Sequence, residues 1–154
     1  MPLDKKFQRN LFIYDSQINL LIQGSGKITL FSEYIYLEPN QSLINGIPQN
    51  NSCKNNYYIE RPEATATLIF QDKLESCSQM FEKCENIKEI DLSEFDFSEV
   101  NNISNMFRDC TNLEKIQFGK INTSLLESMK SLFFGCSKLI SADLIDFTHL
   151  LLLI

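Results

Sequence analysis

The chain is poor in the residues on which many catalytic and metal sites depend. Its 154 residues include no Trp, five Gly and a single His, His149. With one imidazole and no Cys-x-x-Cys pair, a tetrahedral zinc site is not expected. Gly24-Ser25-Gly26 lacks both the Lys-Ser/Thr of a phosphate-binding loop and the third Gly of a dinucleotide-binding turn, which indicates a simple bend. The sequence therefore predicts no cofactor and no metal.

Clustered basic residues and long apolar runs are scarce as well. Fourteen Lys and Arg stand against 20 Asp and Glu, for a net charge of −6, and the longest basic run is Lys5-Lys6. Because nucleic acids bind clustered Lys and Arg, they are not expected partners. No segment approaches the roughly 18 apolar residues of a membrane-spanning helix. No signal peptide is recognisable either, so membrane association is expected only through segments not present in this chain.

Catalysis finds little support in the residues that remain. His149 lies beside the apolar run Leu150–Ile154, where a packing role is favoured over a partnership with a nucleophile. Asp91 has Glu94 and Asp96 nearby, but nothing in the sequence predicts the burial that would separate their pKa values. The chain is therefore not expected to be an enzyme.

What the chain does contain is a pattern that recurs every 26 residues. Met80-Phe81-x-x-Cys84 is followed by Met106-Phe107-x-x-Cys110 and then by Leu132-Phe133-x-x-Cys136. Self-similarity at a fixed period is typical of arrays in which each unit buries its apolar side against its neighbours. The spacing predicts that the three Phe side chains lie in register in a shared interior.

The cysteines follow the same period. There are five, at positions 53, 77, 84, 110 and 136, so at least one is unpaired within a monomer. Three of them occupy the same position in successive repeats. Since Cys is often buried as a small apolar residue, a column of core thiols is favoured, with disulfides as the alternative.

Within each repeat, one segment predicts a helix. Apolar residues at offsets 0, 3, 6, 7 and 10 from Leu74, Val100 and Leu126 define one helical face. Ser98 and Ser124 are the expected N-caps of the second and third helices.

A second segment of each repeat predicts a strand. Ile90-Asp91-Leu92 alternates with period two, as a short strand in a parallel stack does. Phe95, Ile121 and Phe147 follow these strands and are expected to form an apolar spine. The predicted fold is α/β, a leucine-rich-repeat-type solenoid of about three strand-helix units.

The first part of the chain has a different pattern. Short alternating runs near residues 18–23, 27–31, 34–37 and 57–59 predict strands, and Asn45-Gly46 predicts a hairpin turn. We expect a β-rich N-terminal cap over residues 1–62 and the repeat array over residues 63–154. The array ends within a unit, which indicates truncation at the C-terminus.

The repeats resemble the BspA-like leucine-rich repeat family, the surface-protein repeats of bacteria and protists. Met80 to Val100 follows the family form M-F-x-x-C-x-x-L-x-x-I-D-L-S-x-F-D-T-S-x-V almost position by position, and the likeness covers about residues 74 to 149. The resemblance implies a cell-surface or membrane-associated protein that binds other proteins, often in adhesion.

The outward positions of the predicted strands are the candidate binding residues. They are Glu89, Asp91, Glu94, Lys115, Gln117, Lys120, Asp143 and Asp146. The alternating signs on neighbouring strands have two readings: a site for a protein or glycan partner, or pairs that stabilise adjacent strands by about 0.2–1 kcal/mol each. An intracellular repeat scaffold, or a gene fragment without independent function, is the alternative to a surface binding module. Reduced cysteines would favour the cytosol, and a glycan on an Asn-x-Ser/Thr triplet would favour export.

Overall fold

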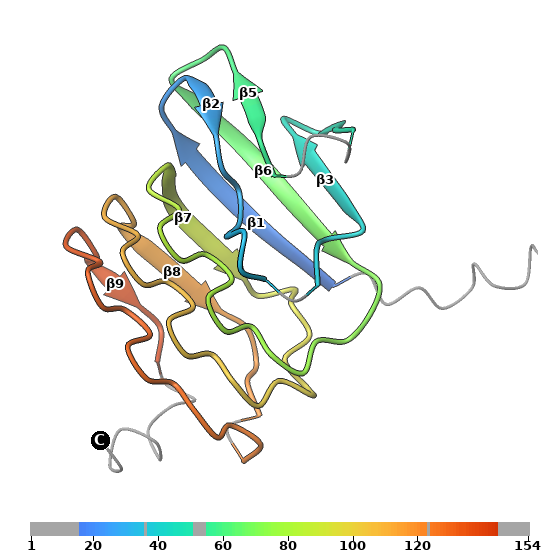
Figure 1. Cartoon of the computed structure of the whole chain (residues 1–154), viewed down its shortest axis with the longest axis vertical. Helices are drawn as coiled ribbons and strands as arrows, with labels where there is room; N and C mark the ends of the chain where they lie inside the picture. Colours follow the sequence, from blue (N-terminus) through green and yellow to red (C-terminus); the bar gives the residue numbers. More distant parts are fainter. Residues whose placement is uncertain (1–15, 36, 51–54, 123, 145–154) are drawn as a thin grey trace, which may run out of the picture.

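Strands are the only regular elements in the described part of the chain (Figure 1). The computed structural model describes residues 16–35, 37–50, 55–122 and 124–144. The strands are β1 (Ser16–Gln23), β2 (Gly26–Ile28), β3 (Gln41–Ile44), β4 (Ile47–Pro48), β5 (Tyr57–Ile59), β6 (Glu63–Phe70), β7 (Ile87–Leu92), β8 (Lys115–Phe118) and β9 (Ser141–Ala142). Seven form one mixed sheet in the order β4-β3-β6-β1-β7-β8-β9, and β2 pairs with β5.

The N-terminal strands form because apolar and polar residues alternate. In β1, Ile18, Leu20 and Ile22 are buried while their neighbours face outward, as a half-buried strand requires. β1 pairs antiparallel with β6 along its whole length, from Ser16 opposite Phe70 to Gln23 opposite Glu63. These contacts confirm the predicted strand over residues 18–23.

The hairpin of β3 and β4 lies at the edge of the sheet. Asn45 and Gly46 close it with φ angles of 51° and 76°, as the predicted turn requires. The predicted strands near 27–31 and 57–59 correspond to β2 and β5, whereas Tyr34, Ile35 and Leu37 belong to no strand. β6 begins at the predicted boundary between cap and repeats, and it pairs with both β1 and β3. A division into two domains stays a prediction.

The three repeats pair with one another at the predicted period. β7, β8 and β9 are parallel, with Glu89 opposite Lys115 and Lys115 opposite Ser141. Near the start of each repeat, before its strand, single parallel bridges join Ser76 to Asn102 and Asn102 to Ser128. Both sets of partners are 26 residues apart, so successive repeats lie in register.

The predicted α/β solenoid of strand-helix units is nevertheless wrong. No helix occurs in the described residues. In addition, β7 pairs antiparallel with β1, so the strands of the repeats belong to the mixed sheet. The segments predicted to be helical contain residues with positive φ at repeating positions: Gln79, Lys83, Asn105, Asp109, Ser131 and Gly135. A left-handed residue interrupts a right-handed helix, so two such residues in each repeat prevent it from forming.

Main-chain hydrogen bonds between repeats replace the helix. The N–H groups of Cys77, Gln79, Phe81 and Lys83 donate to carbonyls 25 residues further along, at 2.8 to 3.0 Å. The residues between them close tight turns, as Met80 does by donating to the carbonyl of Cys77 at 3.2 Å. Each repeat is therefore a string of turns whose alternate amides bind the next repeat.

Ser98 and Ser124, the two predicted helix caps, lie in turns instead. The Ser98 N–H is bound by its neighbour Asp96, whose Oδ1 lies 2.8 Å away. The Ser124 N–H likewise donates to Asn122 Oδ1 at 3.2 Å. Such Asp and Asn side chains favour turns over helices, because they bind the backbone two residues on.

Stacked Phe rings fill the interior of the repeats. Phe81 and Phe107 lie 5.7 Å apart between ring centroids with an interplanar angle of 3°, and Phe107 and Phe133 lie 5.8 Å apart at 6°. The predicted register of the three rings is confirmed. Phe95 and Ile121 of the expected spine are buried, and Phe147 lies outside the described residues.

Thiols run beside the rings, buried at Cys77, Cys84 and Cys110 and partly buried at Cys136. Cys110 Sγ donates to the carbonyl of Phe81, and Cys136 Sγ to that of Phe107, each at 2.9 Å. Cys77, Cys84, Cys110 and Cys136 are all unpaired, as the reading of core thiols predicted, and Cys53 lies outside the described residues.

No helix in the described residues has the length and apolar character needed to cross a bilayer.

Replacing Lys83 with Gly tests the turn structure against a helix. Lys83 is exposed and has a φ of 61°, and Gly135 stands at its position in the third repeat. Because Gly adopts positive φ freely, Lys83→Gly should leave the free energy of unfolding unchanged or raise it by about 0.5–1 kcal/mol. If this segment were a helix, the same substitution would lower the free energy of unfolding by about 1 kcal/mol. Urea unfolding shows whether the free energy of unfolding rises or falls. Glu85→Gly is the control: Glu85 is exposed and has an ordinary φ, so this substitution should destabilise the protein.

Because the thiols are buried, we expect the protein to lose stability at alkaline pH. Burial raises the pKa of Cys84 to about 12, and it raises the pKa of Cys110 as well. Unfolded thiols lose protons above about pH 8.5, while the buried thiols keep theirs, so the folded state loses stability as pH rises. Between about pH 9 and pH 12, the free energy of unfolding of the wild type should fall by about 1.4 kcal/mol per pH unit more than that of Cys84→Ala. Urea unfolding at several pH values measures this, and equal slopes would contradict it.

Candidate binding face

Four of the predicted site residues lie together on one face of the sheet. Glu89 and Asp91 belong to β7, and Lys115 and Gln117 belong to β8. They alternate with buried Ile90, Leu92, Ile116 and Phe118, so all four side chains leave the sheet on the same side. The register places Glu89 beside Lys115 and Asp91 beside Gln117.

β1 and β6 continue the same face. Asn19 of β1 is the register partner of both Asp91 and Thr67, and Leu21 is the partner of both Glu89 and Thr65. A hollow of about 440 Å³ spans the four strands. Its lining is Asn19, Leu20, Leu21, Thr65, Ala66, Thr67, Glu89, Ile90, Asp91, Lys115 and Gln117. We call this surface the sheet-face hollow.

The sequence did not predict the contribution of β1 and β6. Their alternating patterns were recognised, but pairing Asn19 with Asp91 joins residues far apart in the chain. The other predicted residues lie elsewhere. Glu94, Lys120 and Asp143 are exposed outside the strands and do not line the hollow, and Asp146 lies outside the described residues.

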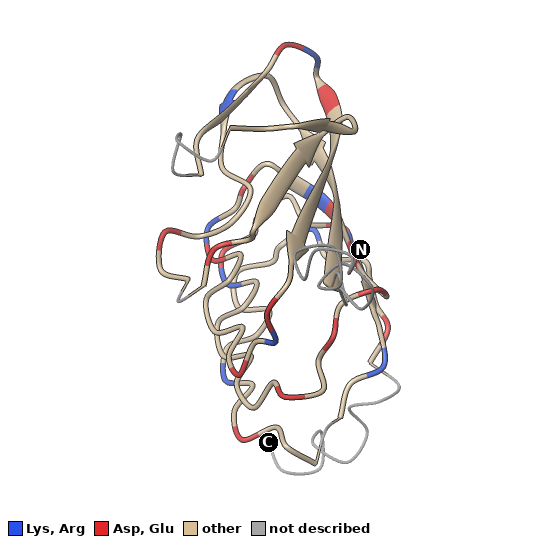
Figure 2. Cartoon of the chain, turned by 90° about the vertical axis from the view of Figure 1, so that its right-hand side faces the viewer, with Lys and Arg blue, Asp and Glu red and all other residues tan. Residues whose placement is uncertain are grey.

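The charged groups of the hollow are not paired with one another. Among the described residues, ion pairs are formed by Lys73 and Arg108, and none joins Lys115 to Glu89 or Asp91. Asn19 Oδ1 accepts a hydrogen bond from Thr67 Oγ1 at 2.8 Å, which fixes the polar wall beside the acidic residues. Figure 2 shows acidic and basic residues interspersed along the ribbon. The hollow therefore offers carboxylates and an ammonium to a ligand carrying both signs.

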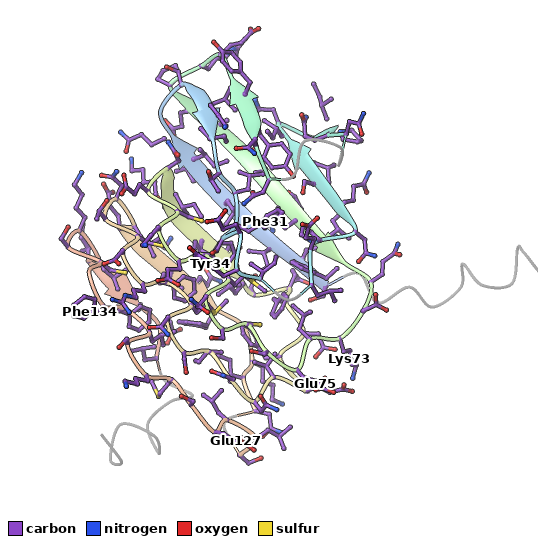
Figure 3. The ribbon with its side chains drawn as sticks, viewed as in Figure 1. Phe31, Tyr34, Lys73, Glu75, Glu127 and Phe134 are labelled. Carbon is purple, nitrogen blue, oxygen red and sulfur yellow. The ribbon has the colours of Figure 1, made fainter. Side chains whose placement is uncertain are left out.

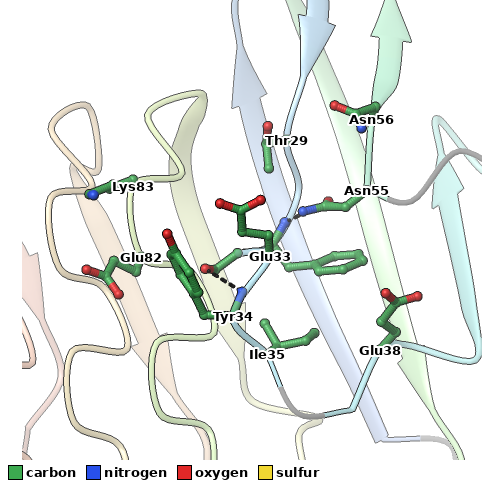
Figure 4. Close-up of a pocket in the computed structure, with 11 residues that line it drawn as sticks. Thr29, Glu33, Tyr34, Ile35, Glu38, Asn55, Asn56, Glu82 and Lys83 are labelled. Atoms are coloured by element: carbon green, nitrogen blue, oxygen red, sulfur yellow. Dashed lines mark hydrogen bonds between the residues drawn. The ribbon is translucent and has the colours of Figure 1, made fainter.

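A second hollow, of about 670 Å³, lies between the loop after β2 and the first repeat (Figure 4). Glu33, Tyr34, Glu38 and Glu82 line it. The side chain of Glu82 is only 9% exposed, and its carboxylate accepts a hydrogen bond from Gln79 Nε2 at 2.6 Å. Since this buried carboxylate already has a protein partner, the sheet-face hollow is the stronger candidate.

A charged cluster at Lys73 joins the first two repeats. Lys73 Nζ donates to Ser98 Oγ at 2.9 Å and lies 3.3 Å from a Glu99 carboxylate oxygen. The hydrogen bond and charge of Glu99 raise the pKa of Lys73. Burial opposes ionisation of Asp96, but hydrogen bonds from Ser98 and the charge of Lys73 outweigh it and lower the pKa of Asp96. The cluster is a structural cross-link.

The described residues provide no metal centre. No group of three or more His, Cys, Asp or Glu is placed there to hold an ion. None of the residues lining the sheet-face hollow is His or Cys.

Replacing Lys115 with Gln separates the two readings of the charged face. Because Lys115 forms no ion pair with Glu89 or Asp91, its loss should change the free energy of unfolding by less than about 0.5 kcal/mol. Lys73→Gln, which removes a paired charge, is the comparison. A loss above about 1 kcal/mol for Lys115→Gln in urea unfolding would show instead that the face stabilises the strands.

Comparison with known families places the repeats but assigns no activity. Residues 74–148 match the model of a family described as "Mycoplasma protein of unknown function, DUF285". No curated protein and no solved structure matches the chain. The matched segment contains the three repeats and carries half of the sheet-face hollow, namely β7 and β8. The repeat segment is thus similar to a family of unknown function, and a leucine-rich repeat is not shown.

Proposed function

We propose that the chain is a non-catalytic binding module that recognises a polypeptide through the sheet-face hollow. One observation carries the proposal: Glu89, Asp91, Lys115 and Gln117 lie together in a hollow that β1 and β6 complete. These residues come from strands held by a mixed sheet, which supplies a rigid base. Binding residues on rigid elements keep their geometry and lose little conformational entropy.

The hollow is large enough to hold the anchoring side chains of a larger protein interface. Its volume of about 440 Å³ accommodates one or two side chains. Specific protein interfaces bury about 800 Å² on each partner, and a few central residues contribute most of the affinity. The surrounding outer face of β6, β1, β7 and β8 would supply the remaining contact. A partner with a Lys or Arg over Glu89 and Asp91, and an acidic group towards Lys115, has the complementary charge.

Two cellular settings suit such a module. The resemblance to surface-protein repeats supports adhesion at a cell surface, and an intracellular scaffold is the second candidate. Free cysteines do not distinguish them, because burial protects Cys84 and Cys110 from oxidants in either setting. Surface labelling of intact cells with an antibody against the chain would decide, since only an exported protein is labelled.

Selection from a random peptide display library tests the binding face. Peptides retained by the wild-type chain should be enriched in paired basic and acidic residues. Their affinity should fall at least tenfold for Asp91→Lys and for Lys115→Glu, measured by calorimetry. Lys120→Glu is the matched control, because Lys120 is an exposed lysine that does not line the hollow.

The same variants define the outcomes that would overturn the proposal. Equal loss of affinity with Lys120→Glu would show only a dependence on net charge. Retained affinity in both hollow variants, with intact folding by circular dichroism, would remove this face from consideration. Binding confined to a glycan array would replace the polypeptide by a carbohydrate.

A further inference from the structure

We infer, on the basis of the proposed function, that the sheet-face hollow binds an extended segment lying across its strands, with a basic residue between an apolar and an acidic one. The hollow is longer across the strands than along them. It spans β6, β1, β7 and β8, with two outward side chains from each strand. At about 4.8 Å between strands and about 6.7 Å between outward residues of one strand, it extends about 14 Å across and about 7 Å along. An extended segment therefore fits across the strands.

The outward side chains change in character from one strand to the next. One row across the sheet consists of Leu21 on β1, Glu89 on β7 and Lys115 on β8, each the register partner of the next. Leu21 is partly exposed, whereas the other apolar residues that line the hollow are buried. The row therefore reads apolar, acidic and basic. A ligand of complementary charge carries an apolar, a basic and an acidic residue in that order.

The strand at the centre of this order is acidic in both rows. Glu89 and Asp91 leave β7 on the same side, and no ion pair among the described residues neutralises either carboxylate. Asp91 Oδ1 accepts a hydrogen bond from the Ser93 N–H at 2.9 Å, which holds this carboxylate in place. A basic residue over β7 meets two carboxylates, whereas an acidic residue there meets two like charges and is rejected.

Side-chain amides in the second row favour an extended ligand over a helical one. Asn19 Oδ1 accepts a hydrogen bond from Thr67 Oγ1 at 2.8 Å, so the Asn19 side chain presents its N–H groups to a ligand. Gln117 carries a second side-chain amide, and neither amide donates to another described residue. In the interior of a helix the main-chain carbonyls are already bonded, whereas an extended segment leaves its carbonyls free to accept.

The large exposed aromatic residues lie outside this surface. Tyr34 and Phe134 are 58% and 61% exposed, but both lie in turns and neither lines the hollow (Figure 3). The apolar contact with the ligand is therefore made at Leu21, which suits one aliphatic side chain.

Six peptides of identical composition test the order of the ligand residues. Each carries Leu, Lys and Glu at alternate positions of a short Ser-rich host, and the six differ only in the order of these three. In NMR titrations of the wild-type chain, the two peptides with Lys in the centre should bind at least tenfold more tightly than the other four. Alternate residues of an extended segment are about 6.7 Å apart, and the long Lys and Glu side chains adapt to the strand spacing of about 4.8 Å.

Exchanging the charges of β7 and β8 provides the matched variant. Glu89→Lys combined with Lys115→Glu keeps the net charge and should abolish the preference for a central Lys. Glu94→Lys combined with Lys120→Glu makes the same exchange outside the hollow and should retain the preference. Leu21→Thr is the second test should the first variant fail to fold. With this variant, replacing the Leu of a preferred peptide by Ser should no longer lower the affinity.

The outcomes separate this inference from the proposed function. Equal affinity for all six peptides would overturn the inference and leave the proposed function standing. A preference that survives the exchange of Glu89 and Lys115, or a Leu-to-Ser effect that survives Leu21→Thr, would do the same. If no peptide shifts the amide signals of β1 and β7 at millimolar concentration, the proposed function fails and the inference fails with it.

Discussion

The hydrogen bonds that run from each repeat to the next are the constraint on which the rest of this structure depends. They require alternate amides to point along the stack, and the left-handed residues near Gln79 and Lys83 turn the chain so that they do. Once the ladder fixes successive repeats in register, Phe81 must lie over Phe107, and the Cys110 thiol must meet the carbonyl of Phe81 in the preceding repeat. The stacked interior follows from the backbone arrangement.

The period, the register, the stacked rings and the free thiols could all be predicted from the sequence, and the helices could not. A face with offsets 0, 3, 6, 7 and 10 fits a helix and a string of tight turns equally well, because both bury residues about every third position. The distinguishing signal was Gly135, at the position of Lys83 and Asp109. Gly and Asp tolerate left-handed backbone, and helices disfavour both. Reading that column across repeats would have favoured turns.

The binding face shows a different limit of sequence reasoning. Outward residues of β7 and β8 were predictable because the repeat sets their register. The neighbours supplied by β1 and β6 were not, because no local pattern says which strand will cover the first repeat. The alternation in residues 16–23 predicts a half-buried strand but leaves its partner open. The hollow forms only because β1 inserts between β6 and β7.

The side chains of the sheet-face hollow and the hydrogen bonds between repeats use different directions of the same sheet. Side chains such as Asp91 and Lys115 leave the sheet through its face, whereas strand pairing at β9 lies in its plane. The charges that face a ligand are therefore separate from the main-chain groups that join the repeats, so a substitution at Asp91 or Lys115 can change binding without disturbing the hydrogen bonds between repeats.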